Sequence, residues 1–246
     1  MKVICITQAR MGSSRLPGKV LKIIGTRPML EYHVRRVAKS KLINHHIIAT
    51  SNQENDLPIV EYCQQNNIDY YRGNETDVLG RFYETALSVH AEPDDIIIRL
   101  TGDCPLICPQ LIDDAIKLQF SGESQQYTHV SLAYFPRGFD VEVFRMRSLS
   151  EAYFKALAPA QREHVTLYLY SKPDALIVPV TLHGNPSWSH FRLCVDEQDD
   201  FLLVEQLICR LGEQWLDAGP RQICELLEGN PQLVTINAHI HQRTAH

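Results

Sequence analysis

The sequence has no apolar stretch that approaches the ~20 residues a membrane-spanning helix requires. Its first residues are one lysine, a short strand-like run and a polar loop, a pattern unlike a secretory signal peptide. A repeat, a low-complexity tract and a long linker are also missing. We therefore expect a cytoplasmic protein of 246 residues that does not contact a membrane and forms a single domain, 1–246.

The sequence has fewer basic than acidic residues: 24 Lys and Arg against 29 Asp and Glu, which gives a net charge of -5. This balance argues against a nucleic-acid partner but leaves room for a local basic site that binds a small anion. The cysteines number seven, and several lie in apolar runs, as Cys5, Cys194 and Cys209 do. An odd count in such surroundings favours free thiols over a disulfide framework.

Strand-like and helical patterns alternate along the first half of the chain. Nearly continuous apolar runs predict buried strands, and apolar residues at helical spacing predict helices. The strands are expected at 2–8, 45–51, 68–73 and 94–103, and the helices at 28–41, 56–67, 76–91 and 109–120. Four strand–helix units in a row imply an α/β protein whose parallel sheet is covered by helices on both faces. Ligands then bind beyond the carboxyl ends of the strands.

The pattern changes after residue 119. The stretch 127–144 predicts two strands joined by a Pro-Arg-Gly turn. Further strands are expected at 175–182 and 190–196, and helices at 148–157, 160–170, 199–211 and 220–229. We interpret this half as a substrate region inserted in or appended to the same α/β domain.

The loop "TQARMGSSRLPGK" places Arg10, Arg15 and Lys19 close together, with Gly12 and Gly18 between them. It follows a predicted strand and precedes a predicted helix, so its amides and cations could hold a polyphosphate. It is not a Walker loop, because the glycine-to-lysine spacing is one residue too long and no Ser or Thr follows the lysine. It is not a GxGxxG loop either. A solvated basic turn is the alternative.

Two aspartates end apolar runs that we predict to be strands. Asp103 follows glycine in "RLTGDCPLI", and Asp196 closes "FRLCV". Both would reach the sheet edge that carries the basic loop, where they could hold Mg²⁺ together with phosphate oxygens. Each could instead be a turn residue or a helix cap. We read Cys104 and Cys108 as non-ligands, because their spacing is too wide for a CxxC zinc pair.

Several motifs together resemble the cytidylyltransferase-like family of spore-coat polysaccharide biosynthesis proteins, relatives of the acylneuraminate and 3-deoxy-manno-octulosonate cytidylyltransferases. They are "TQARMGSSRLPGKVL", "RGNETDVLGRFY", "RLTGDCPLICPQLID", "FPRGFDVEVF", "REHVTLYLY" and "FRLCVDEQDDF". The resemblance covers residues 3 to about 211. It implies a three-layer, Rossmann-like nucleotide-diphospho-sugar transferase fold with a mostly parallel central sheet. Residues 1–120 would bind the nucleotide, and residues 121–246 would bind a sugar and form a homodimer.

The resemblance also implies roles for individual residues. Arg15, Lys19, Asp103 and Asp196 would be catalytic, and the two aspartates would hold Mg²⁺. Nucleotide contacts are expected from Gln8, Ala9, Arg10, Gly12, Ser13, Ser14, Arg15, Lys19, Arg72, Asp77, Thr101, Gly102 and Asp103. Sugar contacts are expected from Arg81, Arg137, Asp140, Glu142, Arg162, Glu163 and His164.

Two of these sugar contacts have a chemical reason. Arg162 would be the carboxylate clamp, because a guanidinium grips a carboxylate with two parallel bonds. His164 is expected at a helix start, either as a surface histidine or as a group that contacts the sugar.

The reaction implied is transfer of CMP from CTP to a small sugar, an acidic 2-keto sugar in this interpretation, with release of pyrophosphate for surface polysaccharide assembly. Such a transfer depends on positioning and electrostatic stabilisation, and it requires no nucleophilic side chain. Two alternatives stay open. One is a glycosyltransferase of the same fold, against which the absence of an Asp-x-Asp triplet argues. The other is a non-catalytic nucleotide-binding relative.

Overall fold

A seven-stranded sheet in the order β5-β4-β1-β6-β8-β7-β9 forms the centre of the computed structural model. The structure describes residues 1–123, 125–181 and 187–241. Its strands are β1 (Val3–Gln8), β4 (His45–Ser51), β5 (Asp69–Gly73), β6 (Ile96–Thr101), β7 (Tyr127–Val130), β8 (Glu142–Arg145) and β9 (Ile177–Val180). β1 pairs in parallel with β4 and β6, and β4 with β5, whereas β8 runs antiparallel to β6 and β7. The mostly parallel sheet is confirmed.

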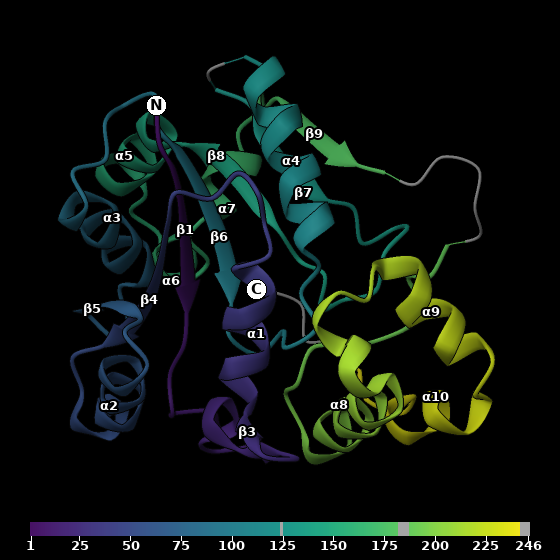
Figure 1. The fold of residues 1–246 in the computed structure, drawn as a ribbon. Coiled ribbons are helices and arrows are strands. Elements are labelled where there is room, and N and C mark those ends of the chain that lie inside the picture. The colour runs from purple at the N-terminus through teal and green to yellow at the C-terminus, as the bar shows by residue number, and fades with distance from the viewer. Residues whose placement is uncertain (124, 182–186, 242–246) are drawn as a thin grey trace.

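Helices cover both faces of the sheet (Figure 1). One layer contains α1 (Met29–Val37), α2 (Leu57–Gln65), α4 (Pro109–Ser121), α8 (Gln198–Leu211), α9 (Pro220–Glu228) and α10 (Pro231–Asn237). The other contains α3 (Val78–Ser88), α5 (Met146–Lys155), α6 (Pro159–Glu163) and α7 (Leu167–Tyr170). Short 3-10 turns lie at η1 (Lys19–Leu21), η2 (Glu54–Asp56) and η3 (Gly212–Leu216), and a small hairpin pairs β2 (Ile23–Ile24) with β3 (Arg27–Pro28).

The two sides of β1 explain why its sequence is a continuous apolar run. Val3 and Cys5 pack into the first layer, and Ile4 and Ile6 into the second. A strand buried on both faces cannot alternate apolar and polar residues.

All seven cysteines are free thiols, as expected. In the described ranges, no helix combines the length and the hydropathy that crossing a membrane would need.

Two local expectations were wrong. Residues 190–196 form no strand; Arg192 makes an isolated parallel bridge with Arg137, and bonds from Val195 N to Asp103 O (2.8 Å) and from Leu193 N to Arg137 O (2.7 Å) hold the segment. The predicted helix 160–170 is broken into α6 and α7. The helix expected from residue 28 does begin there, as α1 at Met29, but η1 and an unpredicted β2–β3 hairpin separate it from the basic loop. The last residue of the strand predicted at 175–182 lies outside the described ranges.

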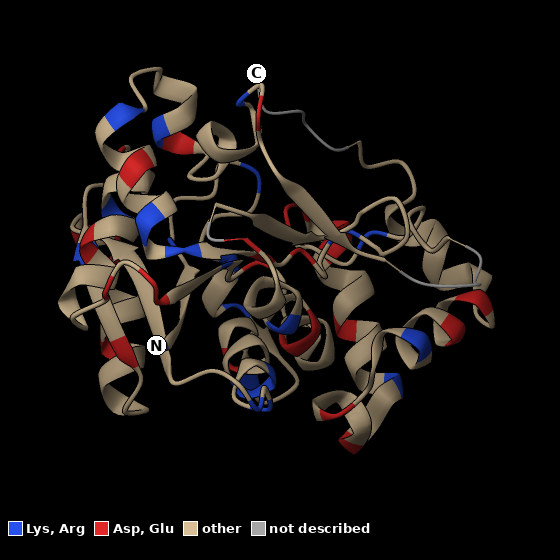
Figure 2. Ribbon diagram, turned by 90° about the horizontal axis from the view of Figure 1, so that it is seen from above, with Lys and Arg blue, Asp and Glu red and all other residues tan. Residues whose placement is uncertain are grey.

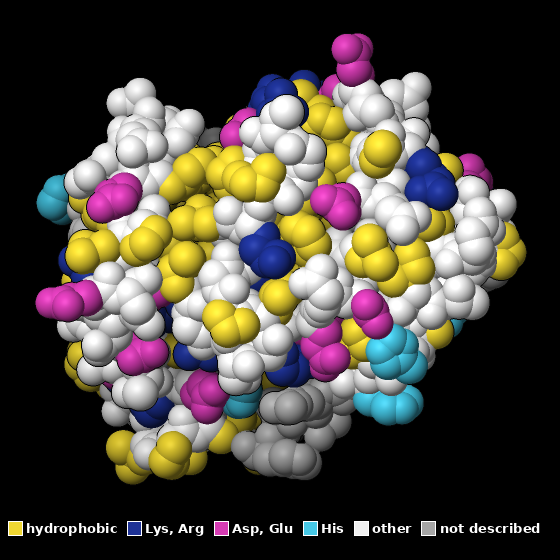
Figure 3. Space-filling view, turned by 90° about the horizontal axis from the view of Figure 1, so that it is seen from below, with side chains coloured by type: hydrophobic (Ala, Val, Ile, Leu, Met, Phe, Trp, Pro, Cys, Tyr) yellow, Lys and Arg dark blue, Asp and Glu magenta, His cyan; other side chains and the backbone are white. Residues whose placement is uncertain are grey.

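Charges of both signs are interspersed over the ribbon (Figure 2). Figure 3 views the molecule from the end at which β1 and β6 finish. On the part of this face formed by described residues, Lys and Arg side chains lie scattered among acidic and apolar ones. A basic site in this protein is therefore a local feature of a cleft.

Candidate active site

A cleft of about 540 Å³ opens at the carboxyl ends of β1 and β6. Parallel strands end together at this edge, which is where open α/β sheets bind ligands. The cleft is lined by Gln8, Ala9, Arg10, Ser13, Ser14, Arg15, Lys19, Val20, Glu75, Thr76, Val78, Arg81, Arg99, Thr101, Gly102, Asp103, Glu163, His164 and Asp196.

The basic loop is fixed in place by Asp56, a buried residue at the end of η2. The Asp56 carboxylate accepts the Met11 amide at 2.7 Å, and its second oxygen accepts the amide and hydroxyl of Ser51. The Gly18 amide then donates to the Met11 carbonyl oxygen (2.9 Å) and closes the loop. Gly18 has φ of +70°, a backbone conformation that favours glycine, and it leads directly into Lys19.

Lys19 lies between the two predicted metal-binding aspartates. Its Nζ donates to Asp196 Oδ1 at 2.9 Å, to Asp103 Oδ2 at 3.1 Å and to the Val195 carbonyl oxygen at 2.6 Å. Burial opposes the ammonium charge, but the attraction of Asp103 and Asp196 outweighs burial and raises the pKa of Lys19. Oxygens from two distant segments therefore converge on one cation.

Asp196 is surrounded by positive charge. Its Oδ2 contacts Arg15 Nη2 at 3.0 Å and Arg192 Nη2 at 2.7 Å. Burial alone would raise the pKa of Asp196, but Lys19, Arg15 and Arg192 lower it to about 2. Arg192 also contacts the buried Asp200 at 2.9 Å, and this pairing ties Asp196 to the start of α8.

The structure argues against a solvated basic turn and against a helix-capping role for either aspartate, and it places Asp103 in a turn after β6. Arg15 and Lys19 are not a solvated turn, because their side chains are 22% and 9% exposed. The N-cap of α8 is Glu197, in a capping box with Asp200, so Asp196 does not cap it. Asp103 caps no helix, since the residue that precedes α4 is Cys108.

Most of the predicted site residues line the cleft, and seven do not. Those brought together are Gln8, Ala9, Arg10, Ser13, Ser14, Arg15, Lys19, Arg81, Thr101, Gly102, Asp103, Glu163, His164 and Asp196. Those outside the lining are Gly12, Arg72, Asp77, Arg137, Asp140, Glu142 and Arg162. His164 lies at the end of α6, where a helix start had been expected.

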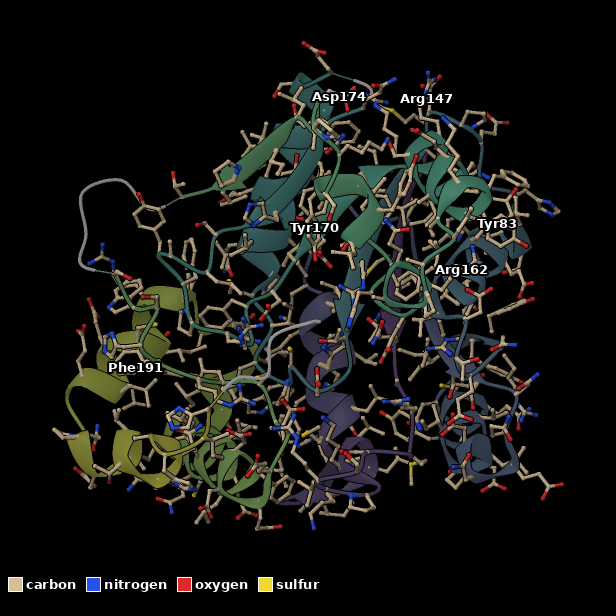
Figure 4. The ribbon with its side chains drawn as sticks, turned by 180° about the vertical axis from the view of Figure 1, so that it is seen from behind. Tyr83, Arg147, Arg162, Tyr170, Asp174 and Phe191 are labelled. Atoms are coloured by element: carbon tan, nitrogen blue, oxygen red, sulfur yellow. The ribbon has the colours of Figure 1, made fainter. Side chains whose placement is uncertain are left out.

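Arg162, the predicted carboxylate clamp, is already engaged. Its Nη2 pairs with Asp77, the N-cap of α3, and its Nη1 donates to the Tyr153 carbonyl oxygen at 2.7 Å. Its guanidinium also lies over the Tyr153 ring, which stacks on Tyr83 (Figure 4). These contacts make Arg162 a link between α3, α5 and α6.

Arg137 and Asp140 face each other at 3.6 Å and do not line the cleft. Burial raises the pKa of Asp140 despite the bond it accepts from the Gly138 amide at 2.6 Å.

Sequence reasoning missed five lining residues: Val20, Glu75, Thr76, Val78 and Arg99. Of these, Arg99 was the residue with a detectable signal, because a charged side chain interrupts an otherwise apolar strand.

The fold and this cleft define an α/β nucleotidyltransferase with a Rossmann-like sheet. A family model described as Cytidylyltransferase matches residues 4–210, and the chain belongs to that family. The spore coat polysaccharide biosynthesis protein SpsF of Bacillus subtilis is 34% identical over 95% of this chain and 97% of its own. A 3-deoxy-manno-octulosonate cytidylyltransferase of Lawsonia intracellularis is 34% identical over 128 residues, 51% of this chain and 48% of its own. The solved structure of a cytidylyltransferase from Leptospira borgpetersenii superimposes with a TM-score of 0.88 and 26% identity, over all of both chains.

These similarities confirm the resemblance identified from the motifs. The chain is an enzyme of the cytidylyltransferase class, and its cleft is the candidate active site.

Proposed function

We propose that this enzyme transfers CMP from CTP to a hydroxyl group of a small acidic sugar, in support of surface polysaccharide assembly. The sugar oxygen forms a bond to the α-phosphorus and loses its proton to water, the bond between that phosphorus and the oxygen bridging to the β-phosphorus breaks, and pyrophosphate leaves. The observation that carries the proposal is Lys19, held between Asp103 and Asp196 at the end of a loop that also brings Arg10 and Arg15 into the cleft.

The loop residues suit the phosphate end of this reaction. Negative charge grows on the leaving pyrophosphate, and cations already in position stabilise it without reorganisation. Arg15 and Lys19 are both held by carboxylates, so their side chains are ordered before a nucleotide arrives. Arg10 is exposed at the mouth of the cleft, where it would meet the incoming triphosphate.

Asp103 and Asp196 have the oxygen ligands that a magnesium ion needs. One oxygen of each lies against Lys19 Nζ, at 3.1 Å for Asp103 and 2.9 Å for Asp196, so an ion between them would take the place that Nζ holds and Lys19 would turn to the phosphates. In the described ranges no three His, Cys, Asp or Glu side chains form a metal cluster. Magnesium in nucleotide sites needs one or two carboxylates, because phosphates and water supply the other oxygens. When bound, the ion would act as a Lewis acid on the phosphate oxygens.

Two observations support CTP and a sugar as the substrates. The relatives named above include a protein of spore coat polysaccharide biosynthesis and a 3-deoxy-manno-octulosonate cytidylyltransferase. The cleft also extends beyond the phosphate loop to Arg81, Glu163 and His164, which leaves a polar region for the sugar.

Calorimetric titration with CTP, UTP, ATP and GTP, with and without Mg²⁺, tests the proposal. Wild type should bind CTP selectively, and Mg²⁺ should strengthen binding. Asp103→Asn should lose the magnesium effect, whereas Lys117→Met, an exposed control on α4 outside the cleft lining, should retain it. A protein that ignored every triphosphate but bound a nucleotide diphosphate-sugar would support the glycosyltransferase alternative instead.

A further inference from the structure

Arg99 lines the cleft, yet it belongs to neither the phosphate loop nor the aspartate pair. It lies on β6 two residues before Thr101, so both side chains are on the same face of the sheet. The β1–β6 register places Thr101 beside Gln8, which also lines the cleft. Arg99 is thus part of the cleft floor, on the side that α6 covers with Glu163 and His164.

Glu142 holds Arg99 from behind. The antiparallel register pairs the two residues directly across β6 and β8, and Arg99 Nη1 donates to Glu142 Oε2. The other Glu142 oxygen accepts the Thr166 hydroxyl at 2.6 Å and the Tyr127 hydroxyl. Burial alone would raise the pKa of Glu142, but Arg99 and these hydroxyls lower it. Glu142 therefore stays ionised and its oxygens are taken, which makes it a support for Arg99 and not a ligand itself.

The guanidinium of Arg99 keeps unused donors. Nη2 reaches Gln8 Oε1 only at 3.5 Å, the outer limit of a hydrogen bond, and Nε is buried with no partner in the described part of the chain. The side chain is 18% exposed. A charged group that is largely desolvated and only half paired binds an anionic oxygen strongly.

We infer that Arg99 is a specificity-determining residue that binds the carboxylate of the acceptor sugar, with Gln8 beside it and Glu142 as its positioning residue. This rests on the proposed cytidylyl transfer. Arg99 then takes the role of carboxylate clamp that the sequence analysis gave to Arg162. The Arg162 guanidinium is already bound by Asp77 and the Tyr153 carbonyl oxygen. The sugar carboxylate then lies over β6, next to the α-phosphate end of the cleft.

The test compares each acid with its neutral methyl ester. CTP binding is measured first, by calorimetry, on wild type, Arg99→Met and Arg99→Lys; wild type that failed to bind CTP would remove the proposed function itself. Each CTP-saturated protein is then titrated with 3-deoxy-manno-octulosonate, N-acetylneuraminate and glucuronate and with their methyl esters. Calcium replaces magnesium in these titrations to limit turnover. Pyrophosphate release with magnesium follows for every sugar that binds.

Wild type should bind at least one acid ten-fold or more tightly than its ester. Arg99→Met should abolish that preference, Arg99→Lys should restore part of it, and Arg147→Met should leave it intact, because Arg147 is exposed on α5 and pairs with Asp94 (Figure 4). Three results would overturn the inference while CTP still binds: equal affinity of wild type for acid and ester, an undiminished preference in Arg99→Met, or binding by none of the three acids.

Discussion

His33 should make the free energy of unfolding fall steeply between pH 8 and pH 5. Its ring is fully buried, with Nδ1 2.9 Å from the Cys104 carbonyl oxygen and Nε2 2.9 Å from Thr7 Oγ1. A carbonyl oxygen can only accept, so Nδ1 carries the proton and Nε2 accepts from the Thr7 hydroxyl. Burial lowers the pKa of His33 to about 4 from its ordinary 6.5, and the neutral ring is the native form.

The direction of the effect follows from proton linkage. Because the folded pKa lies below the unfolded one, the unfolded chain binds a proton between pH 6.5 and 4 that the folded chain does not. The stability associated with the neutral ring is complete above pH 6.5 and is lost as the pH falls through this window. At pH 5 the loss is about 2 kcal/mol relative to pH 8. His46, whose pKa burial lowers to about 3, adds a similar loss of the same sign.

Urea unfolding of wild type and His33→Gln, at pH 8, 7, 6 and 5, measures this contribution. Wild type should lose about 4 kcal/mol over the range from the two histidines, and the variant about 2 kcal/mol less. Each protein is compared with its own value at pH 8, so the cost of the substitution itself drops out. The other titratable groups are shared by both proteins, and among them His46 loses in the variant the part of its pKa lowering that His33 contributes. Parallel stability curves for the two proteins would refute the reasoning.

Three further substitutions have expected outcomes. Lys19→Met leaves Asp103 and Asp196 without the cation between them, so CTP affinity should fall roughly 10–100-fold in calorimetric titration; unchanged affinity would show that Lys19 does not reach the triphosphate. Arg36→Met removes a fully buried guanidinium that donates to the carbonyls of Ile107, Trp215 and Ala218. The free energy of unfolding, measured in urea, should fall by about 3 kcal/mol or more. A fall of less than about 1 kcal/mol would mean that those carbonyls find other donors. Gly138→Ala should lower the melting temperature and reduce the free energy of unfolding by about 1–3 kcal/mol. The reason is that φ is +108° at this position and the added Cβ would lie 2.6 Å from the Leu193 backbone carbon. An unchanged melting temperature would mean that the 131–141 segment relaxes freely.

The first half of the fold could be predicted from local patterns. β1, β4 and β6 contain apolar runs buried by layers on both faces, and the helices α1, α2 and α3 between them show apolar residues at helical spacing. The same logic failed for residues 190–196, which form an equally apolar run. Their backbone partners are Asp103 and Arg137, which lie far away in sequence, and local spacing carries no information about them.

The site too has a part that local patterns predict and a part that they do not. The placement of Lys19 and Asp103 in the cleft could be predicted, because a loop after a strand and a carboxylate at a strand end are local features that share one sheet edge. The roles of Arg99 and Arg162 depend on which partner each meets, Glu142 across the β6–β8 register and Asp77 at the start of α3. Two arginines that look equivalent in the sequence thus differ in the structure: one faces the cleft and the other braces helices.

The reversed direction of β8 decides which part of the second half can vary. In the parallel strands, the segment that follows each strand opens on the cleft edge. In β8, which runs antiparallel to β6, it is the segment before the strand, 131–141, that arrives at this edge. Insertions or deletions there would change the chain at this edge, outside the cleft lining, without shifting the β6–β8 register or the parallel strands beyond it. A chain built this way can vary one connection at the edge where its cleft opens while the paired strands of the sheet stay fixed.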